Sequence, residues 1–387
     1  MFKYFAIHII RFLLHIFYIF PVNKKKIFFA SYEGRQFTCN PKYIFLDMYK
    51  KMSKLKYVWC LNNGPSELSE YKSVIIVKRE TLLWFYHILT AKVIITNRHL
   101  RGFLPYRRNQ IIINTWHGGG AYKKIGFADN SDKARRYWIN KGKTEFFALV
   151  IPNITWFISS CKKFSDVMHE SCHIVYKKFI PIGMPRNDIF FGDNKDFTIT
   201  LKSKLNIPLD YGIVLYAPTY RGSNRSSEYN SVMELDMEKL KNSLKEKYGN
   251  EFVCLYRYHY LFSNKFQCIG TIDVSSYNDM QELLLIADVL ITDYSSCTWD
   301  FSLTSKPCFL FTPDLDLYLT HDRGFYVPIE QWPYPLAKTN DELCNNIANF
   351  NQEEYNDKVK KHHEDLGSYE HGTATSKVTQ LLQGIFA

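Results

Sequence analysis

Short apolar runs alternate along this chain with longer segments in which apolar residues recur every three or four positions. In the first half, strand-like runs lie at 27–31, 57–60, 74–77, 93–96 and 110–116, and a helix is expected from Asn40-Pro41 to about Met52. In the second half, which starts near Ile207-Pro208, strand-like runs lie at 213–217, 252–257, 271–274, 289–292 and 308–311, with helices at 237–248 and 280–286. This alternation predicts parallel sheets covered by helices, an α/β fold.

The length of the chain indicates more than one domain. Its 387 residues exceed what one ordinary core accommodates. We expect an amino-terminal helix at 1–22, a first α/β domain at 23–195 and a second at 196–387, whose last helix could pack back on the first.

Residues 2–20 are mostly apolar but carry a polar stripe at helical spacing, formed by Tyr4, His8, Arg11, His15 and Tyr18. A membrane span is disfavoured because a charge near mid-bilayer costs about 2.5–3.5 kcal/mol. A signal peptide is disfavoured because no small-residue cleavage site precedes Lys24. A helix packed on the core and a helix in the membrane interface remain. The second is favoured, with Lys24-Lys25-Lys26 set against anionic lipid.

Charge and cysteine content narrow the partners. Lys and Arg outnumber Asp and Glu by 49 to 38, a net charge of +11, which suits nucleic acid, an anionic membrane or a phosphorylated substrate. The sequence has no recognisable nucleic-acid-binding pattern, so we expect no nucleic-acid partner. The nine cysteines are scattered, odd in number and without CxxC, as in a chain of reduced thiols rather than a disulfide or zinc framework.

The first candidate for chemistry is His117, followed by Gly118-Gly119-Gly120 just after the run at 110–116. Open α/β sheets bind ligands past the carboxyl ends of their strands, and histidine is the natural general base near neutral pH. A loop histidine without function is the plain alternative. HGGG also occurs in lipase-type hydrolases, but these need a GxSxG nucleophile, which this sequence lacks.

The second candidate is the stretch 287–296, where an apolar run ends in Asp293, Ser295 and Ser296. Hydroxyls and backbone N–H groups at a helix start suit a phosphate. Simple capping needs only one hydroxyl, and here three polar residues cluster. The stretch therefore predicts a pyrophosphate site.

Basic residues follow two further strand-like runs. Arg257 and His259 follow the run at 252–257, and Arg221 follows that at 213–217, where they could neutralise a transferring phosphoryl group. Solvated surface charges are the alternative for each arginine alone. Asp314-Leu-Asp316 is a weak metal motif that we interpret as loop, with no obligatory metal, and His362-His363, on a charged helix, is expected to be solvated.

Taken together and in order, the motifs between about residues 27 and 328 resemble the CDP-glycerol:poly(glycerophosphate) glycerophosphotransferases of teichoic acid and capsule synthesis. The supporting segments are 40–42, 115–118, 123–126, 183–188, 216–221, 257–259, 287–296, Asp300-Phe301, Lys306-Pro307 and Arg323-Gly324. The resemblance implies the GT-B architecture, two Rossmann-like doubly wound domains with an active-site cleft between them. The chain departs from the family pattern at Gly119-Gly120, where relatives carry a bulkier residue and often a proline.

The resemblance also implies roles for residues. It makes His117 the general base and places His259, Ser295 and Ser296 on the donor pyrophosphate. The remaining residues expected to bind substrate or donor are Gly118, Arg186, Arg221, Arg257, Asp279, Asp293 and Arg323.

The function expected from the resemblance is transfer of glycerol phosphate from CDP-glycerol to a hydroxyl of a lipid-linked acceptor, with release of CMP and no obligatory cofactor. The enzyme would work as a peripheral protein at the cytoplasmic face of a bacterial membrane. A CDP-ribitol phosphotransferase, a GT-B nucleotide-sugar glycosyltransferase and a non-catalytic membrane scaffold are the alternatives.

Overall fold

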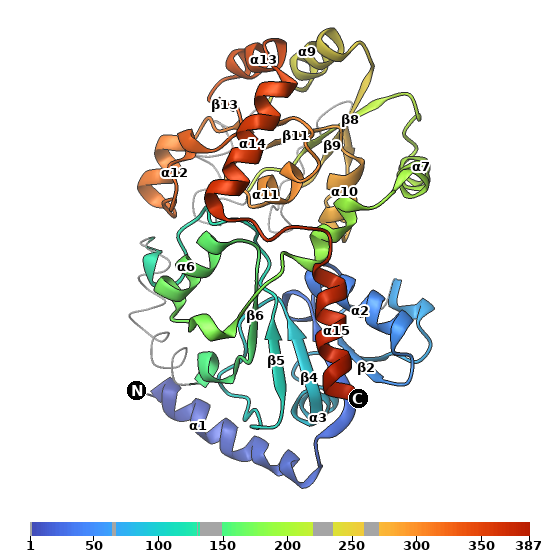
Figure 1. Cartoon of the computed structure of the whole chain (residues 1–387), viewed down its shortest axis with the longest axis vertical. Coiled ribbons are helices and arrows are strands. Elements are labelled where there is room, and N and C mark those ends of the chain that lie inside the picture. Colours follow the sequence, from blue (N-terminus) through green and yellow to red (C-terminus); the bar gives the residue numbers. More distant parts are fainter. Residues whose placement is uncertain (1, 64–66, 130, 132–148, 220–234, 259–270) are drawn as a thin grey trace. The chain divides into compact units, whose positions relative to one another are not determined.

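The computed structural model describes residues 2–63, 67–129, 131, 149–219, 235–258 and 271–387 (Figure 1). The chain forms two compact units. The first contains Met1–Gly118, Ile125–Asp188 and Ser368–Ala387, and the second contains Gly119–Lys124 and Ile189–Gly367. Segment 119–124 therefore belongs to the second unit, although the residues on either side of it belong to the first. Segment 368–387, at the end of the chain, belongs to the first unit.

The first unit is built on a parallel sheet of seven strands in the order β3-β2-β1-β4-β5-β6-β7. The strands are β1 (Asn23–Ala30), β2 (Lys56–Cys60), β3 (Ile75–Val77), β4 (Ala91–Thr96), β5 (Ile111–Asn114), β6 (Trp156–Ser159) and β7 (Phe179–Pro181). The chain order reverses at β1, which lies between β2 and β4. Such a reversal is where doubly wound sheets open a crevice at the carboxyl ends of their strands.

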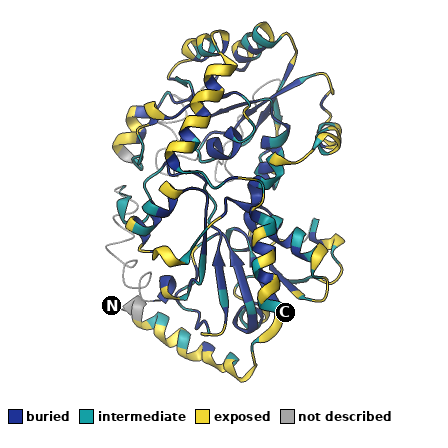
Figure 2. Cartoon of the chain, in the orientation of Figure 1, coloured by how far each residue is buried: buried dark blue, intermediate teal, exposed yellow. Residues whose placement is uncertain are grey.

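Helices cover this sheet on both faces, so its strands are mostly apolar instead of alternating, apart from the polar start of β1. They are α2 (Cys39–Lys51), α3 (Leu82–Thr90), α6 (Lys162–Cys172) and α15 (Ala374–Phe386). Strands β2, β4, β5 and β6 are buried along most of their length, whereas the edge strands β3 and β7 are mostly half-buried (Figure 2). In the core, the Phe29 and Trp59 rings stack at 5.3 Å and Phe45 meets Trp59 edge-on at 5.7 Å. Helix α15 packs against α2.

The second unit repeats the arrangement with a parallel sheet of six strands in the order β10-β9-β8-β11-β12-β13. The strands are β8 (Gly212–Tyr216), β9 (Phe252–Tyr256), β10 (Thr271–Asp273), β11 (Val289–Thr292), β12 (Cys308–Phe311) and β13 (Leu336–Ala337). The helices are α7 (Lys195–Lys204), α9 (Met237–Tyr248), α10 (Met280–Ile286), α11 (Cys297–Ser302), α12 (Leu315–His321), α13 (Asn340–Ala348) and α14 (Gln352–Leu366). The predicted α/β fold with two parallel sheets is confirmed.

The amino terminus folds as α1 (Phe2–Leu14), continued by the 3-10 helix η1 (His15–Ile19). Two members of its polar stripe bond to the first unit: Arg11 Nη1 donates to the carbonyls of Gly102 and Leu104 at 2.6 and 2.8 Å, and Tyr18 Oη donates to the carbonyl of Pro105 at 2.8 Å. The opposite, apolar face is exposed (Figure 2). Within the described residues, no helix is long and apolar enough to cross a membrane.

The expected lysine triplet is not one continuous basic patch. Lys24 and Lys25 are exposed, as expected, but Lys26 lies inside β1 and is 1% exposed. Its Nζ donates to Thr90 Oγ1 at 2.5 Å and lies 4.4 Å from the centre of the Tyr86 ring. Burial, together with the charge of Lys56, lowers the pKa of Lys26 to about 8. The prediction that Lys26 faces lipid is therefore wrong, because strand pairing starts four residues earlier than expected.

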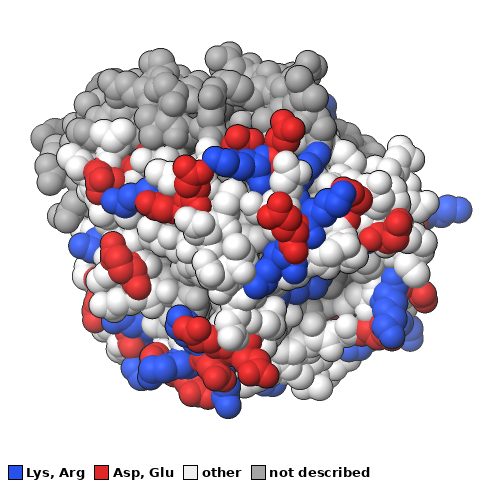
Figure 3. Space-filling model, turned by 90° about the horizontal axis from the view of Figure 1, so that it is seen from above, with Lys and Arg blue, Asp and Glu red and all other residues white. Residues whose placement is uncertain are grey.

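Among the described residues visible in Figure 3, basic and acidic side chains are interspersed. A nucleic-acid-binding face concentrates basic side chains instead. The eight described cysteines are free, and seven of them are buried, as expected for small core residues.

Candidate active site

His117 stands on a sharp turn just past the carboxyl end of β5. Thr115 N donates to Thr96 O at 2.8 Å and so extends the pairing of β5 with β4 by one residue. Trp116 then takes the left-handed conformation at φ 53°, and its N–H donates to Asn114 Oδ1 at 2.9 Å. A bulky residue rarely adopts this conformation without support from its surroundings. The turn ends the strand and directs the next side chain, His117, to the edge of the sheet.

The hydrogen bonds of His117 define its tautomer. Its Nδ1 lies 2.9 Å from the backbone oxygen of Asn97, and because a carbonyl can only accept, Nδ1 carries the hydrogen. Nε2 then holds a free lone pair, as a general base requires. The ring is partly buried and meets the Tyr32 ring edge-on at 5.7 Å. Burial, followed by the charges of Arg98 and Arg186, lowers the pKa of His117 to about 3, so the imidazole is neutral at neutral pH.

Two segments distant in sequence hold this turn from behind. Asn40 Nδ2 donates to the carbonyls of Thr115 and Trp116 at 3.0 and 3.2 Å, and Asn40 Oδ1 accepts from the backbone N–H of Arg186 at 3.0 Å. The Arg186 side chain is buried, and its Nη1 donates to the carbonyl of His117 at 2.8 Å. Nη1 of Arg186 also donates to Cys39 Sγ at 3.2 Å. Its expected role in substrate binding stays a prediction.

The carboxyl-terminal segment of the chain completes this support. Glu370 accepts from Met184 N at 3.0 Å and from Asn187 Nδ2 at 3.1 Å. Asp188 accepts from the N–H groups that begin α15, those of Ala374 at 3.1 Å and Thr375 at 2.7 Å. The sequence offered no signal for Glu370 or for Asn97, since neither belongs to a recognisable motif.

In the second unit, Asp293 follows β11 and is 1% exposed. Its carboxylate accepts from Thr219 N at 3.0 and 2.9 Å and from Thr219 Oγ1 at 2.5 Å. Asp293 therefore fixes the loop that follows β8. In this structure its oxygens serve the neighbouring loop, and its expected contact with donor stays a prediction.

Ser295 and Ser296 precede α11 and are partly exposed. Ser295 Oγ accepts from Cys297 N at 3.3 Å, whereas the Ser296 side chain makes no hydrogen bond to any described residue. One serine thus caps the helix and the other keeps its hydroxyl available. The expectation that the pair also binds the donor pyrophosphate stays a prediction.

The remaining expected donor residues also belong to the second unit. Asp279 is buried and caps α10 by accepting from Gln281 N at 3.1 Å, and Arg257 N donates to Tyr216 O at 2.9 Å at the end of β9. Arg323 is partly exposed and precedes Gly324, whose carbonyl accepts from Lys124 N at 2.8 Å. Arg221 and His259 lie outside the described residues.

The structure thus places His117, Gly118 and Arg186 in the first unit and the described donor candidates in the second. The division between the units falls inside the HGGG motif, between Gly118 and Gly119.

Comparison with known proteins identifies the chain. Residues 12–384 match the family described as CDP-Glycerol:Poly(glycerophosphate) glycerophosphotransferase. The chain belongs to this family.

Relatives of this glycerophosphotransferase are named for teichoic acid synthesis. It is 31% identical over 383 residues to a teichoic acid poly(glycerol phosphate) polymerase of Bacillus spizizenii, covering 95% of this chain and 94% of that protein. It is 28% identical over 369 residues to a teichoic acid glycerol-phosphate transferase of Staphylococcus aureus, covering 93% of each. Among solved structures, the wall teichoic acid polymerase TagF superposes with a TM-score of 0.82 at 26% identity, covering 99% of this chain and 95% of that one. Relatives named for ribitol phosphate are more distant.

The glycerophosphotransferase also contains an aromatic–histidine cluster that the sequence did not reveal. His362 is 8% exposed and its Nε2 lies 3.0 Å from Tyr122 Oη, while His363 Nε2 lies 2.7 Å from Ser302 Oγ. Trp299 packs 4.2 Å from the His363 ring. The expectation that both histidines are solvated is wrong, because α14 presents them to the core and its lysines and acids to solvent.

Among the described residues of the glycerophosphotransferase, no group of three or more His, Cys, Asp or Glu could hold a metal ion. Asp314, the first acid of the weak DxD motif, is buried and accepts from Tyr294 Oη at 2.9 Å.

Proposed function

We propose that the protein transfers glycerol phosphate from CDP-glycerol to a hydroxyl of a lipid-linked acceptor, releasing CMP, in the synthesis of teichoic acid or a capsule-type polymer. The observation that carries this proposal is the geometry of His117. Its Nδ1–H is bound to Asn97 O and its carbonyl to Arg186, so that Nε2 remains available as a base. This geometry occurs in a chain that matches the glycerophosphotransferase family over residues 12–384.

In the proposed step, Nε2 of His117 accepts the proton of the acceptor hydroxyl while that oxygen attacks the glycerol-bearing phosphorus. The bond from this phosphorus to the bridging oxygen breaks, and CMP departs with the electron pair. The low pKa of His117 keeps the imidazole neutral, so that Nε2 carries no proton before the step. An anionic donor or acceptor close to the ring would raise its basicity during the step. Positioning and electrostatic stabilisation then supply most of the rate.

We assign the donor to the second unit. The available Ser296 hydroxyl and Arg257 at the end of β9 can hold a pyrophosphate. The assignments of His259 and Arg221 to the donor rest on the family resemblance. Transfer requires the donor to present its phosphorus to His117.

The test is CMP release from CDP-glycerol and from CDP-ribitol, each with and without a glycerol phosphate acceptor. We expect acceptor-dependent release from CDP-glycerol, with His117→Ala inactive. His371→Ala is the matched control, since His371 is an exposed histidine of the same unit. Release from CDP-ribitol alone would replace the alditol in the proposal. A fully active His117→Ala would refute the assignment of the base.

We further propose that the protein acts as a peripheral protein at the cytoplasmic face of the membrane. The supporting observation is the outward face of α1 and η1, where Phe12 is 77%, Ile19 70%, Phe5 65%, Ile16 63% and Leu13 62% exposed. Leu82 and Leu83, which begin α3, are 77% and 63% exposed, and α3 contacts η1. Burying such a face in the interface gains about 25 cal/mol per Å² of apolar surface, and Lys24 and Lys25 add attraction to anionic lipid.

Co-sedimentation with vesicles that contain anionic lipid tests the membrane proposal. Phe12→Asp combined with Ile16→Asp should reduce binding strongly, because both charges enter the exposed apolar face. Ile199→Asp is the control, since Ile199 is 50% exposed on the second unit. Undiminished binding of the double variant would rule out this face.

A further inference from the structure

The loop after β4 carries an arginine that the reaction described above does not use. Arg98 N donates to Thr96 Oγ1 at 3.3 Å, and its carbonyl accepts from Asn114 Nδ2 at 3.2 Å. These bonds fix the backbone of Arg98 to β4 and β5, the two strands that position His117. Its side chain is partly exposed, and no hydrogen bond or ion pair joins its guanidinium to any described residue. A fixed backbone with an unpaired guanidinium leaves all five donors of that group available to an anion.

Arg98 lies within electrostatic reach of His117. The residue before it, Asn97, accepts the His117 Nδ1 hydrogen at 2.9 Å. After burial, the charge of Arg98 is the largest cause that lowers the pKa of His117. Asn97 is itself fully buried, and its Nδ2 has no hydrogen-bond partner among the described residues, which is uncommon for a buried donor. Two neighbouring residues beside the proposed base therefore keep unused donors.

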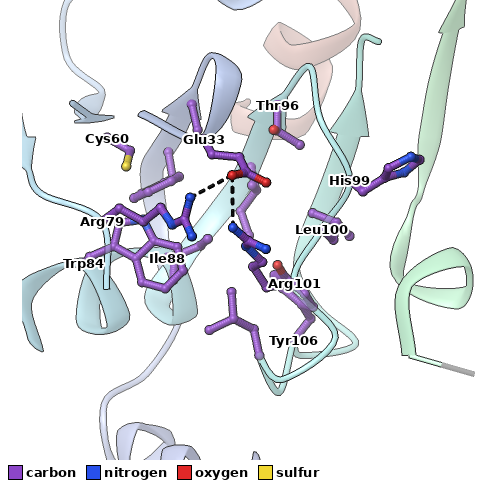
Figure 4. Close-up of a pocket in the computed structure, with 14 residues that line it drawn as sticks. Glu33, Cys60, Arg79, Trp84, Ile88, Thr96, His99, Leu100, Arg101 and Tyr106 are labelled. Carbon is purple, nitrogen blue, oxygen red and sulfur yellow. Dashed lines mark hydrogen bonds and ion pairs between the residues drawn. The ribbon is translucent and has the colours of Figure 1, made fainter. Parts of the chain in front are cut away.

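Arg101, in the same loop, is held by a carboxylate in a strained turn. Its Nη2 lies 3.0 Å from Glu33 Oε2, and Arg79 Nη1 lies 2.7 Å from the same oxygen (Figure 4). No bond joins Nε or Nη1 of Arg101 to a described residue. Glu33 has φ 61° and Tyr32 φ 45°, both left-handed. The turn therefore connects the arginines with the proposed base: Glu33 binds Arg79 and Arg101, and the ring of the preceding residue, Tyr32, contacts the ring of His117.

Arg101 also lines a small cavity, and Arg98 lies three residues before it in the same loop. The cavity has a volume of about 40 Å³, is lined by Glu33, Arg79 and Arg101, and lies where β1, β2 and β4 end (Figure 4). Its deeper wall is apolar, formed by Phe28, Trp84 and Ile94 among others. The guanidinium groups of Arg79 and Arg101 supply the positive charge at this end of the sheet.

We propose that Arg98, with Arg101 beside it, binds a phosphodiester of the acceptor chain, so that the terminal hydroxyl of that chain faces Nε2 of His117. The inference rests on the proposed function and adds the acceptor subsite to it. Guanidinium groups match phosphate oxygens in a planar, bidentate manner. An anion bound at Arg98 also offsets the positive charge that faces His117. Acceptor binding therefore makes the base more basic only when the hydroxyl is in place.

The kinetic test uses CDP-glycerol with two soluble acceptors: tri(glycerol phosphate), and a glycerol glycoside without phosphate. Arg98→Gln should raise the KM for tri(glycerol phosphate) about tenfold or more, the factor that one charge-assisted hydrogen bond supplies. The KM for CDP-glycerol and the KM for the uncharged acceptor should change less than twofold. Arg98→Lys keeps the positive charge but cannot form two parallel hydrogen bonds to a phosphate. Its KM for tri(glycerol phosphate) should therefore lie between that of the wild type and that of Arg98→Gln. Arg108→Gln, at an exposed arginine of the same connection, is the control.

The outcomes separate the subsite from its rivals. An increase in the KM for CDP-glycerol would place Arg98 on the donor instead and overturn the proposal. If Arg98→Gln lowers activity equally with both acceptors, Arg98 has a structural role and the proposal is overturned. An unchanged KM for tri(glycerol phosphate) would also overturn the proposal. Calorimetric titration of tri(glycerol phosphate) into the protein without donor is independent of turnover. If wild type binds it through Arg98 but no variant or wild type releases CMP from CDP-glycerol, the subsite stands and the proposed function falls.

Discussion

Replacing Gly119 by alanine tests the most confined position of the HGGG motif. A Cβ at Gly119 would lie 2.1 Å from Cδ1 of Trp299 and 2.9 Å from its Cγ and Nε1. Carbon atoms in contact are normally about 3.5–4.0 Å apart, so one partner must move by more than about 1 Å. Trp299 is fully buried and packs on His363, which leaves it no room to move. The clash explains why this position requires glycine in this chain.

Overpacking of this kind costs about 1–3 kcal/mol. For a unit of roughly 150–250 residues, this corresponds to a Tm lower by about 2–12 °C, measured by calorimetry. Gly384→Ala is the control, because its Cβ meets nothing within 4 Å and alanine favours helix α15. In a Trp299→Leu background the added methyl should cost less than about 0.5 kcal/mol, since the ring that it strikes is gone. A Tm unchanged by Gly119→Ala would refute the packing argument.

Three further predictions concern the site and the fold. His117→Ala should lower transfer by about 10² or more while CMP affinity, measured by calorimetry, stays the same; a parallel loss of affinity would contradict a role confined to the base. Ser295→Ala with Ser296→Ala should weaken CMP binding about tenfold, and equal affinity would remove the serines from the donor site. Burial lowers the pKa of His87 and of His362 from 6.5 to about 4, so the folded protein keeps both neutral while the unfolded chain binds protons below 6.5. Their contribution to the free energy of unfolding is complete above pH 6.5 and is lost as the pH falls towards 4, by about 1.4 kcal/mol per pH unit for each histidine. His362→Gln should therefore reduce the slope of the free energy of unfolding against pH, measured by urea unfolding. An unchanged slope would argue against a buried neutral His362.

Local patterns were sufficient for most of the two sheets. The long apolar runs became β1, β2, β4, β5, β8, β9, β11 and β12, because buried parallel strands must be apolar on both faces. Strands β6 and β7 were not predicted. They are short, at Trp156–Ser159 and Phe179–Pro181, and pair at the edge of the sheet, where weaker apolar patterns suffice. The helix boundaries of α9 and α10 matched the expected ranges because capping residues mark them.

By itself the sequence determined the class of fold, the family and the identity of the proposed base. Each depends on residues close together in the chain: apolar runs, the HGGG turn and short motifs in a fixed order. It could not determine which distant residues meet. The tertiary structure alone decided that Asn97 sets the tautomer of His117, that Arg186 and Asn40 hold its turn, that Lys26 is buried and that Arg98 remains unpaired. These properties arise from burial and from hydrogen bonds between residues up to 76 positions apart, which no local periodicity encodes.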